Sequence, residues 1–266
     1  MSPFLCPHCR GALQERERSL ICPKGHSFDM AAEGYVNLAV GKSGGGDSPE
    51  MCRGRHEFLS AGYYRSFAEA IADEVARQGA KAVCDAGCGE GFYLRTLRER
   101  LPDASLVGLD LAKTSIKLAA RAEKGKENPI SYAVAGIFDM PLPDGRYDAV
   151  LSVFAPVPEA EAHRILKKDG LLLVAHPGKD HLMGLKRLLY ENPYENEEKD
   201  FAFDGFEKLY DLRSAYTVTV PQARLGNLFL MTPYFWKTSR EDADKLSTVE
   251  SLVTELDFIG SVYRKR

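Results

Sequence analysis

The chain has 266 residues, of which 44% are hydrophobic and 27% charged, and its formal net charge is −3 at pH 7. A chain of this length can bury a core in one large domain or in two unequal domains. Its net charge excludes the class of uniformly basic nucleic-acid-binding proteins, so any contact with RNA must come from local basic patches. No apolar run approaches membrane-spanning length. The N-terminal segment contains cysteines where a signal peptide would have its apolar core. We therefore expect a cytoplasmic protein without a membrane partner.

Four metal-binding side chains lie close together near the N-terminus. Cys6 and Cys9 form a Cys-x2-Cys pair, and Cys22 and His26 follow after twelve residues. Three thiolates and an imidazole at this spacing are what tetrahedral Zn²⁺ needs in a closed structural site. A redox Cys-x-x-Cys is the alternative, but it would leave Cys22 and His26 unexplained. We therefore predict a zinc-binding module over residues 1–38.

A linker and two helices are expected after this module. Residues 41–48 are rich in glycine and serine and offer nothing to bury, which predicts a mobile loop. Pro49 is a favourable first residue for a helix over 49–59, and a second helix is predicted over 67–78. We assign 39–60 to a linker with its helix and 61–266 to the main domain.

The main domain alternates between strands and helices. Strands are predicted at 81–85, 105–109, 130–134, 147–153, 171–175 and 216–220 and within 249–262, and helices at 92–100, 113–123, 158–166, 181–190 and 222–231. Residues 168–170 are interpreted as a turn, and the charged run at 195–200 as a solvated loop. This order predicts an α/β fold with a doubly wound, Rossmann-like sheet that binds ligands beyond the carboxyl ends of its strands.

A glycine-rich turn follows the first strand of the main domain. Asp85 precedes Gly87, Gly89 and Gly91, and Asp110 ends the next strand, where a carboxylate can bind a ribose diol. Glycines let the backbone approach a ligand and adopt φ values that other residues avoid. A tight turn without a ligand is the simpler alternative for the glycines alone. The spacing G-x-G-x-G also differs from the G-x-G-x-x-G of dehydrogenases.

The turn resembles that of class I S-adenosylmethionine-dependent methyltransferases. A sulfonium cofactor is positively charged, so a site edged by Asp85, Glu90 and Asp110 suits it better than it suits a pyrophosphate. Relatives in that class often bind adenine through an Asp that is replaced here by Gly136. We expect backbone groups near Gly136 and Ile137 to bind adenine, with Asp139 as a weaker candidate.

Motifs along nearly the whole chain carry a narrower resemblance. They are Cys-x2-Cys, Cys-x3-His-x-Phe-Asp, Gly-Tyr-Val-Asn-Leu at 34–38, Gly-Asp-Ser-x-Glu-Met at 46–51, Pro-Gly-x-x-His-Leu at 177–182 and Met-Thr-Pro at 231–233. Together they resemble bacterial 23S rRNA (guanine-N1)-methyltransferases of the RlmA type. The resemblance implies methylation of guanine N1 in a 23S rRNA hairpin loop by S-adenosylmethionine, an RNA-binding zinc module and a homodimer. It leaves open which guanine is modified and whether macrolide resistance results.

The same resemblance assigns roles to individual residues. It implies zinc ligation by Cys6, Cys9, Cys22 and His26, and cofactor contacts by Tyr64, Gly89, Glu90 and His181. Methyl transfer to N1 also requires loss of the N1 proton and close positioning of the base.

Phe154 and Pro156 follow the strand at 147–153 and are candidates for positioning the target guanine. Core packing is an equal alternative for Phe154. No general base stands out: His181 could serve but is better explained as a cofactor-side residue, and His176 could equally be structural.

Basic residues supply candidate phosphate contacts, although each alone could be a solvated charge: Arg10, Arg16, Arg18, Lys24, Lys42, Arg53 and Arg55. Two other functions remain open from the sequence. One is a small-molecule methyltransferase with a purely structural zinc module. The other is a non-enzymatic zinc protein that binds RNA, which the intact glycines and Asp110 disfavour.

Overall fold

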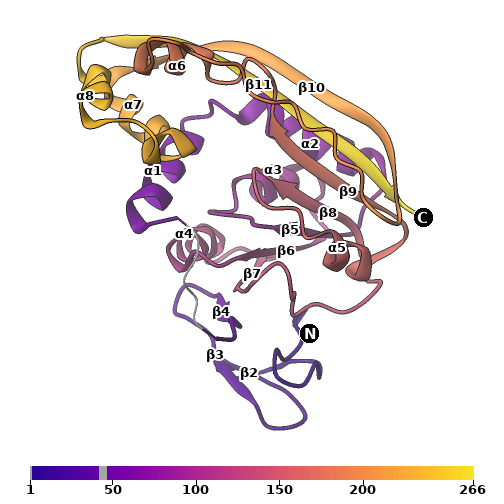
Figure 1. Ribbon diagram of the computed structural model, residues 1–266. Helices are drawn as coiled ribbons and strands as arrows, with labels where there is room; N and C mark the ends of the chain where they lie inside the picture. The colour runs from indigo at the N-terminus through magenta and orange to yellow at the C-terminus, as the bar shows by residue number, and fades with distance from the viewer. Residues whose placement is uncertain (1, 42–46) are drawn as a thin grey trace.

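The computed structural model describes residues 2–41 and 47–266, and its centre is an eight-stranded sheet (Figure 1). The strand order is β10-β11-β9-β8-β5-β6-β7-β4. The strands are β4 (Val36–Asn37), β5 (Ala82–Ala86), β6 (Ser105–Asp110), β7 (Ser131–Val134), β8 (Tyr147–Val153), β9 (Leu166–Pro177), β10 (Phe206–Pro221) and β11 (Ser251–Lys265). Strands β4 to β9 pair in parallel, whereas β10 and β11 add an antiparallel edge. The predicted doubly wound α/β fold is confirmed.

Helices lie on both faces of the sheet. They are α1 (Pro49–Ser60), α2 (Arg65–Arg77), α3 (Phe92–Arg100), α4 (Lys113–Glu123), α5 (Glu159–Ile165), α6 (Met183–Leu189), α7 (Gln222–Leu230) and α8 (Arg240–Asp244), with 3₁₀ turns η1 (Pro233–Trp236) and η2 (Lys245–Ser247). Because side chains alternate along a strand, Val83 and Cys84 of β5 join separate cores. Phe67 of α2 packs in the first core and Ile165 of α5 in the second. None of the helices in the described ranges is long and apolar enough to cross a membrane.

We call the N-terminal segment, up to the end of β3, the ribbon. It contains a small three-stranded antiparallel sheet of β1 (Gln14–Arg16), β2 (Ser19–Ile21) and β3 (Ser27–Asp29). The ribbon lies beside β4, at the lower end of Figure 1. The backbone N–H of Leu5 donates to the carbonyl of Pro141 over 2.8 Å. Val36 and Asn37 pair with β7, so the end of the predicted 1–38 module contributes an edge strand to the main sheet.

Some predicted boundaries were wrong. The predicted turn at 168–170 lies inside β9, which begins at Leu166 and accommodates a positive φ of 61° at Asp169. The prediction of 216–220 covered only the end of β10, because most of that strand is polar and partly exposed at the sheet edge. The predicted mobile loop at 41–48, including Lys42, lies largely outside the described residues.

Candidate functional site

A cleft of about 1300 Å³ opens at the carboxyl ends of β5, β6, β8 and β9. Residues of α1 and of the segments 194–201 and 231–237 also line it. Most of the predicted cofactor and base-binding residues meet here: Tyr64, Gly87, Gly89, Glu90, Asp110, Gly136, Ile137, Phe154, Pro156 and His181. Asp85 is fully buried at the end of β5, and Gly91 is the N-cap of α3, so neither directly lines the cleft.

The glycine turn has the positive φ values that the sequence predicted, and it also packs closely against neighbouring side chains. Gly87, Gly89 and Gly91 have φ values of 87°, 54° and 79°. A Cβ on Gly87 would lie 2.6 Å from the Cβ of Ala155, and one on Gly91 would lie 2.3 Å from the hydroxyl oxygen of Tyr132. Only glycine therefore fits these two positions without moving the surrounding residues.

Asp110 stabilises this turn from the adjacent strand. Its Oδ2 accepts a hydrogen bond from the backbone N–H of Gly89 over 2.9 Å, and its Oδ1 accepts one from Ala112 over 2.7 Å. A carboxylate has about four acceptor positions, so capacity remains for a ribose diol. Asp110 thus both shapes the turn and presents acceptors to the cleft.

Asp85 is a buried acid beneath the turn. Neither of its carboxyl oxygens has a hydrogen-bond partner in the described chain. Burial, with a smaller contribution from the charge of Asp110, raises the pKa of Asp85 to about 8. An unpaired acid in this position fits a ligand that carries positive charge, as S-adenosylmethionine does.

Glu90 connects the glycine turn to α1 through a residue that the sequence did not reveal. Its Oε2 lies 2.9 Å from Nδ1 of His56 and 2.6 Å from Nη2 of Arg95. The hydrogen bond that the His56 ring donates to the Glu90 carboxylate raises the pKa of His56. His56 is 34 residues away in sequence and belongs to no motif, so only the fold brings it here. The result is a charged contact between α1 and the cofactor turn.

His181 and Tyr64 form a buried hydrogen-bonded pair. Nε2 of His181 lies 3.2 Å from the Tyr64 hydroxyl, and the backbone N–H of Asp257 donates to Nδ1 over 3.2 Å. A neutral imidazole that accepts at Nδ1 carries its proton on Nε2. Burial lowers the pKa of His181 to about 3, so it remains neutral.

Phe154 lies in the cleft and is not a core residue. It is 43% exposed, with a φ of 53°, and its ring centroid is 5.9 Å from that of His181. The hydroxyl of Ser152 donates to the carbonyls of Ala155 and Pro156 and so holds the following turn. The core-packing alternative for Phe154 was therefore wrong.

The charged segment at 195–200 is anchored at its start and is not simply solvated. Lys186 of α6 is fully buried, and its Nζ donates to the carbonyl of Tyr194 and to Oδ1 of Asn196, each over 2.7 Å. Nδ2 of Asn196 donates in turn to the carbonyl of His181 over 2.9 Å. These bonds hold the segment against the cleft, and sequence reasoning missed Lys186 because buried lysines have no sequence signature.

The four predicted zinc ligands converge in the ribbon. Ligand atoms of Cys6, Cys9, Cys22 and His26 all lie within 4.8 Å of one another. Nδ1 of His26 is 3.4 Å from Sγ of Cys6 and 3.3 Å from Sγ of Cys22, and the Sγ atoms of Cys9 and Cys22 are 3.6 Å apart. Zinc bond lengths of about 2.0–2.3 Å place tetrahedral ligand atoms at roughly these separations, so the cluster fits a zinc ion.

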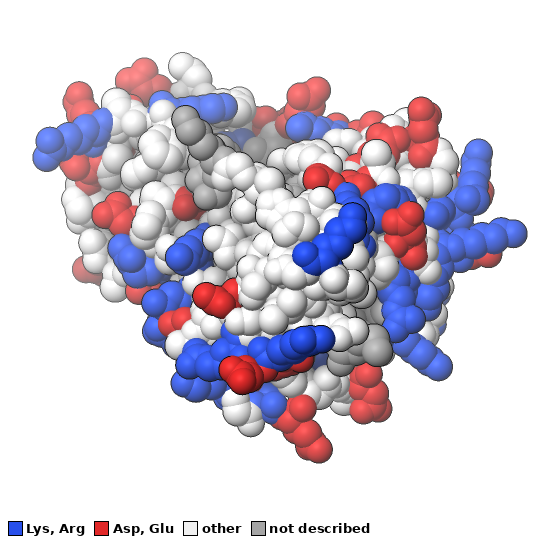
Figure 2. Space-filling view, turned by 90° about the horizontal axis from the view of Figure 1, so that it is seen from below, with Lys and Arg blue, Asp and Glu red and all other residues white. Residues whose placement is uncertain are grey.

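The basic candidates differ in their availability to RNA. Arg10 pairs with Asp139 and donates to the Met140 carbonyl, and Arg55 pairs with Asp47. This pairing engages Asp139, the weaker adenine candidate. Arg10 is nevertheless exposed, as are Arg16, Arg18, Lys24 and Arg53, and these last four have no ion pair within the described residues. Figure 2, which views the molecule from the ribbon end, shows basic and acidic side chains interspersed around a largely uncharged middle.

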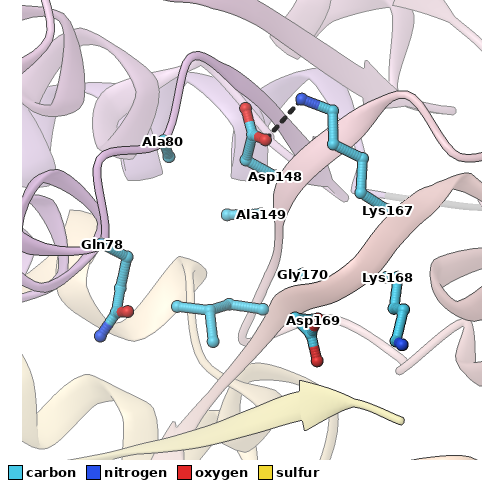
Figure 3. Close-up of a pocket in the computed structure, with 9 residues that line it drawn as sticks. Gln78, Ala80, Asp148, Ala149, Lys167, Lys168, Asp169 and Gly170 are labelled. Atoms are coloured by element: carbon cyan, nitrogen blue, oxygen red, sulfur yellow. Dashed lines mark hydrogen bonds and ion pairs between the residues drawn. The ribbon is translucent and has the colours of Figure 1, made fainter.

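A second hollow, of about 130 Å³, lies at the opposite ends of the strands (Figure 3). Asp148 accepts hydrogen bonds there from the backbone N–H groups of Lys81 and Ala82, each over 2.9 Å, and from Nζ of Lys167 over 2.6 Å. Its carboxylate is satisfied within the fold. We interpret this hollow as a structural feature.

Comparisons with known proteins agree with both parts of the site. A family model for a methyltransferase domain matches residues 83–170, and one for the N-terminal zinc ribbon of RlmA matches residues 4–39. The 23S rRNA (guanine(748)-N(1))-methyltransferase of Streptomyces fradiae is 35% identical, over 91% of this chain and 88% of its own. YxjB of Bacillus subtilis, provisionally named a 23S rRNA (guanine-N(1)-)-methyltransferase, is 31% identical over 96% and 95%. The YcgJ protein of Bacillus subtilis shares the fold, with a TM-score of 0.50 at 16% identity over 76% of this chain and 99% of its own.

Proposed function

The chain belongs to the family of 23S rRNA (guanine-N1)-methyltransferases, and we propose that it transfers a methyl group from S-adenosylmethionine to N1 of a guanine in a 23S rRNA hairpin loop. The observation that carries this proposal is that a single cleft has a side suited to the cofactor and a side suited to a nucleobase. Its β5 and β6 side has the glycine turn with Asp110, and its β8 side presents the half-exposed ring of Phe154. A cofactor and a nucleobase can therefore meet in the same cleft.

We propose that the cofactor lies along the glycine turn. Asp110 would accept the ribose hydroxyls, backbone groups of Gly136 and Ile137 would contact adenine, and Asp85 would compensate positive charge from below. When bound, S-adenosylmethionine supplies an electrophilic methyl group on a sulfonium. Tyr64 and His181 close this side of the cleft as a neutral, hydrogen-bonded pair.

The opposite side of the cleft would bind the base. An extruded guanine can stack on Phe154, while Pro156 limits its position from the same turn. Orientation matters here because N1 must face the methyl carbon in line with the breaking bond. These residues would provide that positioning without forming a covalent intermediate.

The zinc ribbon would contact RNA outside the cleft. Its exposed Arg16, Arg18 and Lys24 can bind phosphates, while Arg10 fastens the ribbon beside the segment at 139–141. We accordingly assign residues 1–38 to RNA recognition, 39–60 to a linker with α1, and 61–266 to the methyltransferase domain.

We further propose that the protein acts in the cytoplasm as a homodimer. Within the described chain, no strand pairs with the outer edge of β10, a strand of 16 residues. An unpaired edge of this length can pair with a second copy. Sedimentation of the purified protein tests the proposed dimer.

Deletion of the gene in its host tests the proposed function. N1-methylguanine blocks Watson–Crick pairing, so reverse transcription of 23S rRNA should stop at one loop guanine in the parent strain and read through in the deletion strain. Return of the stop with the wild-type gene, but not with a variant that lacks the cofactor turn, supports the proposal. An unchanged stop would contradict it. Comparing the same strains on macrolides tests whether the methyl group alters susceptibility.

A further inference from the structure

The proposed reaction needs a group that accepts the N1 proton of guanine. This proton has a pKa well above neutral, and a positioned base within hydrogen-bond reach accelerates its removal. Two histidines line the cleft, His176 and His181. The hydrogen bonds of each histidine decide whether a nitrogen lone pair is available.

His181 has no lone pair to offer. Its Nδ1 accepts from the backbone N–H of Asp257, and its Nε2 is engaged with the Tyr64 hydroxyl. Both ring nitrogens are thus occupied within the fold, and a proton could be added only by breaking a buried hydrogen bond. His181 is a structural and cofactor-side residue.

His176 has the complementary arrangement. Its Nδ1 lies 3.2 Å from the carbonyl of Pro177, which accepts the ring N–H and leaves the lone pair on Nε2. In the part of the chain that the structure describes, Nε2 is buried and has no hydrogen-bond partner. The residue is 7% exposed, and its ring packs edge-on against Phe201 with centroids 5.5 Å apart. A single acceptor is therefore left without a partner in a buried part of the cleft wall.

His176 also lines the same cleft as Phe154, the residue proposed to stack on the guanine. Val153 at the end of β8 is in register with Ala175 of β9, and the backbone N–H of Phe154 donates to the Ala175 carbonyl over 3.0 Å. His176 is the next residue along β9, so it is adjacent to the segment that would hold the base. The charged groups that act on it are Asp211 and Lys208 of β10 and Glu198 of the anchored segment. Burial outweighs their effects and lowers the pKa of His176, which keeps it neutral at neutral pH.

We propose that Nε2 of His176 accepts the N1 proton as N1 attacks the methyl carbon. The N1–carbon bond forms while the carbon–sulfur bond breaks, and the electron pair of that bond remains on sulfur. The proton passes to the imidazole, which becomes an imidazolium and later releases it to solvent. This inference rests on the proposed guanine-N1 activity.

Single-turnover methylation by the full-length zinc-bound protein tests the inference, with His176→Gln beside wild type. His163→Gln is the matched control, because His163 also packs edge-on against a phenylalanine, Phe206, but does not line the cleft. At neutral pH His176→Gln should lower the rate about 100-fold or more, while cofactor affinity by calorimetry and RNA affinity by filter binding stay near wild type. His163→Gln should leave the rate unchanged.

The pH profile separates a base from a structural residue. The deficit of His176→Gln should shrink as pH rises toward the pKa of guanine N1, because the pre-ionised base no longer needs an acceptor. Added imidazole should partly restore His176→Ala. A rate within about threefold of wild type, or a deficit that is equal at every pH and unaffected by imidazole, would overturn the inference. Absence of guanine-N1 methylation by the wild-type protein would instead overturn the proposed function.

Discussion

The ammonium of Lys186 lies 2.7 Å from Oδ1 of Asn196, and this partly buried hydrogen bond fixes the start of the charged segment at the mouth of the cleft. The Lys186 ammonium also lies 4.4 Å from the ring centroid of Tyr194 and 5.5 Å from that of Tyr234. Lys186 has no carboxylate partner among residues 2–41 and 47–266, so its charge is stabilised by carbonyl oxygens and aromatic faces. Burial lowers the pKa of Lys186.

Replacement of Lys186 by methionine should release this segment. The Tyr194 carbonyl and Asn196 Oδ1 would each lose a donor, so we expect a loss of about 1–3 kcal/mol in the free energy of unfolding. Urea denaturation measures the loss, and limited proteolysis should show faster cleavage within 194–200. The adjacent Arg187→Met removes only an exposed ion pair with Glu255 and should cost about 0.5 kcal/mol or less. Equal effects of the two variants would show that Lys186 is not an anchor.

Cofactor affinity should depend on pH through Asp85. The folded-state pKa of about 8 means that Asp85 is protonated at neutral pH before the cofactor binds. A cationic ligand favours the carboxylate, so binding should release a proton below pH 8, and affinity should rise by up to about tenfold per pH unit toward pH 8.

Calorimetry in buffers of different ionisation enthalpy counts the released proton. Asp85→Asn should abolish the release and flatten the pH dependence, whereas Asp148→Asn, at the opposite ends of the strands, should change neither. Proton release that persists in Asp85→Asn would assign the effect to another group.

The same acid affects the stability of the cofactor-free protein. Its folded-state pKa of about 8 is above its ordinary value of 3.8, so the folded form binds the proton more tightly than the unfolded form. The resulting stabilisation is present in full below pH 3.8 and is lost as pH rises toward 8. Asp85→Asn should therefore stabilise the cofactor-free protein most near pH 8, and thermal unfolding at pH 6 and pH 8 measures the difference. A constant difference would contradict the assigned pKa shift.

Removal of zinc should separate RNA methylation from cofactor binding. Cys22→Ala deletes one of the four ligands, so the ribbon should lose its metal and its fold. Methyl transfer to RNA should then fall sharply, while affinity for S-adenosylmethionine stays within about twofold, because the glycine turn lies outside the ribbon. Metal content, RNA methylation and cofactor affinity are measured on one preparation. Loss of cofactor binding would show that ribbon docking through Arg10 and Leu5 is required for the cleft itself.

Phe154→Ala should weaken use of RNA without weakening the fold. Stacking of a base on an aromatic ring contributes about 1–3 kcal/mol, which predicts a loss of about 5- to 150-fold in kcat/KM for RNA. Phe138 is the control residue: it is 66% exposed and lines the cleft next to Gly136 and Ile137, where we expect adenine to bind. Phe138→Ala should therefore raise the KM for the cofactor and not the KM for RNA. Steady-state kinetics with each substrate varied in turn measures both effects. An unchanged kcat/KM for RNA in Phe154→Ala would exclude stacking.

Sequence reasoning predicted the features that depend on local patterns. The bounds of α3 and α4 agree with prediction because a glycine turn and amphipathic spacing define them, and the zinc ligands follow from their spacing. Side-chain pairs between distant segments could not be predicted: His56 with Glu90, or Arg10 with Asp139. Such contacts depend on how α1 and the ribbon pack on the sheet. Most of β10 was missed because an edge strand need not be apolar.

The most direct measurement of the central claim uses purified protein, S-adenosylmethionine labelled in its methyl group, and 23S rRNA transcribed without modifications. After digestion to nucleosides, the label should appear in 1-methylguanosine, and mapping should place it at a single hairpin-loop guanine. Asp110→Asn, which alters the cofactor site, should reduce the labelling. Label in another nucleoside, transfer only to small molecules, or no transfer at all would contradict the proposed function.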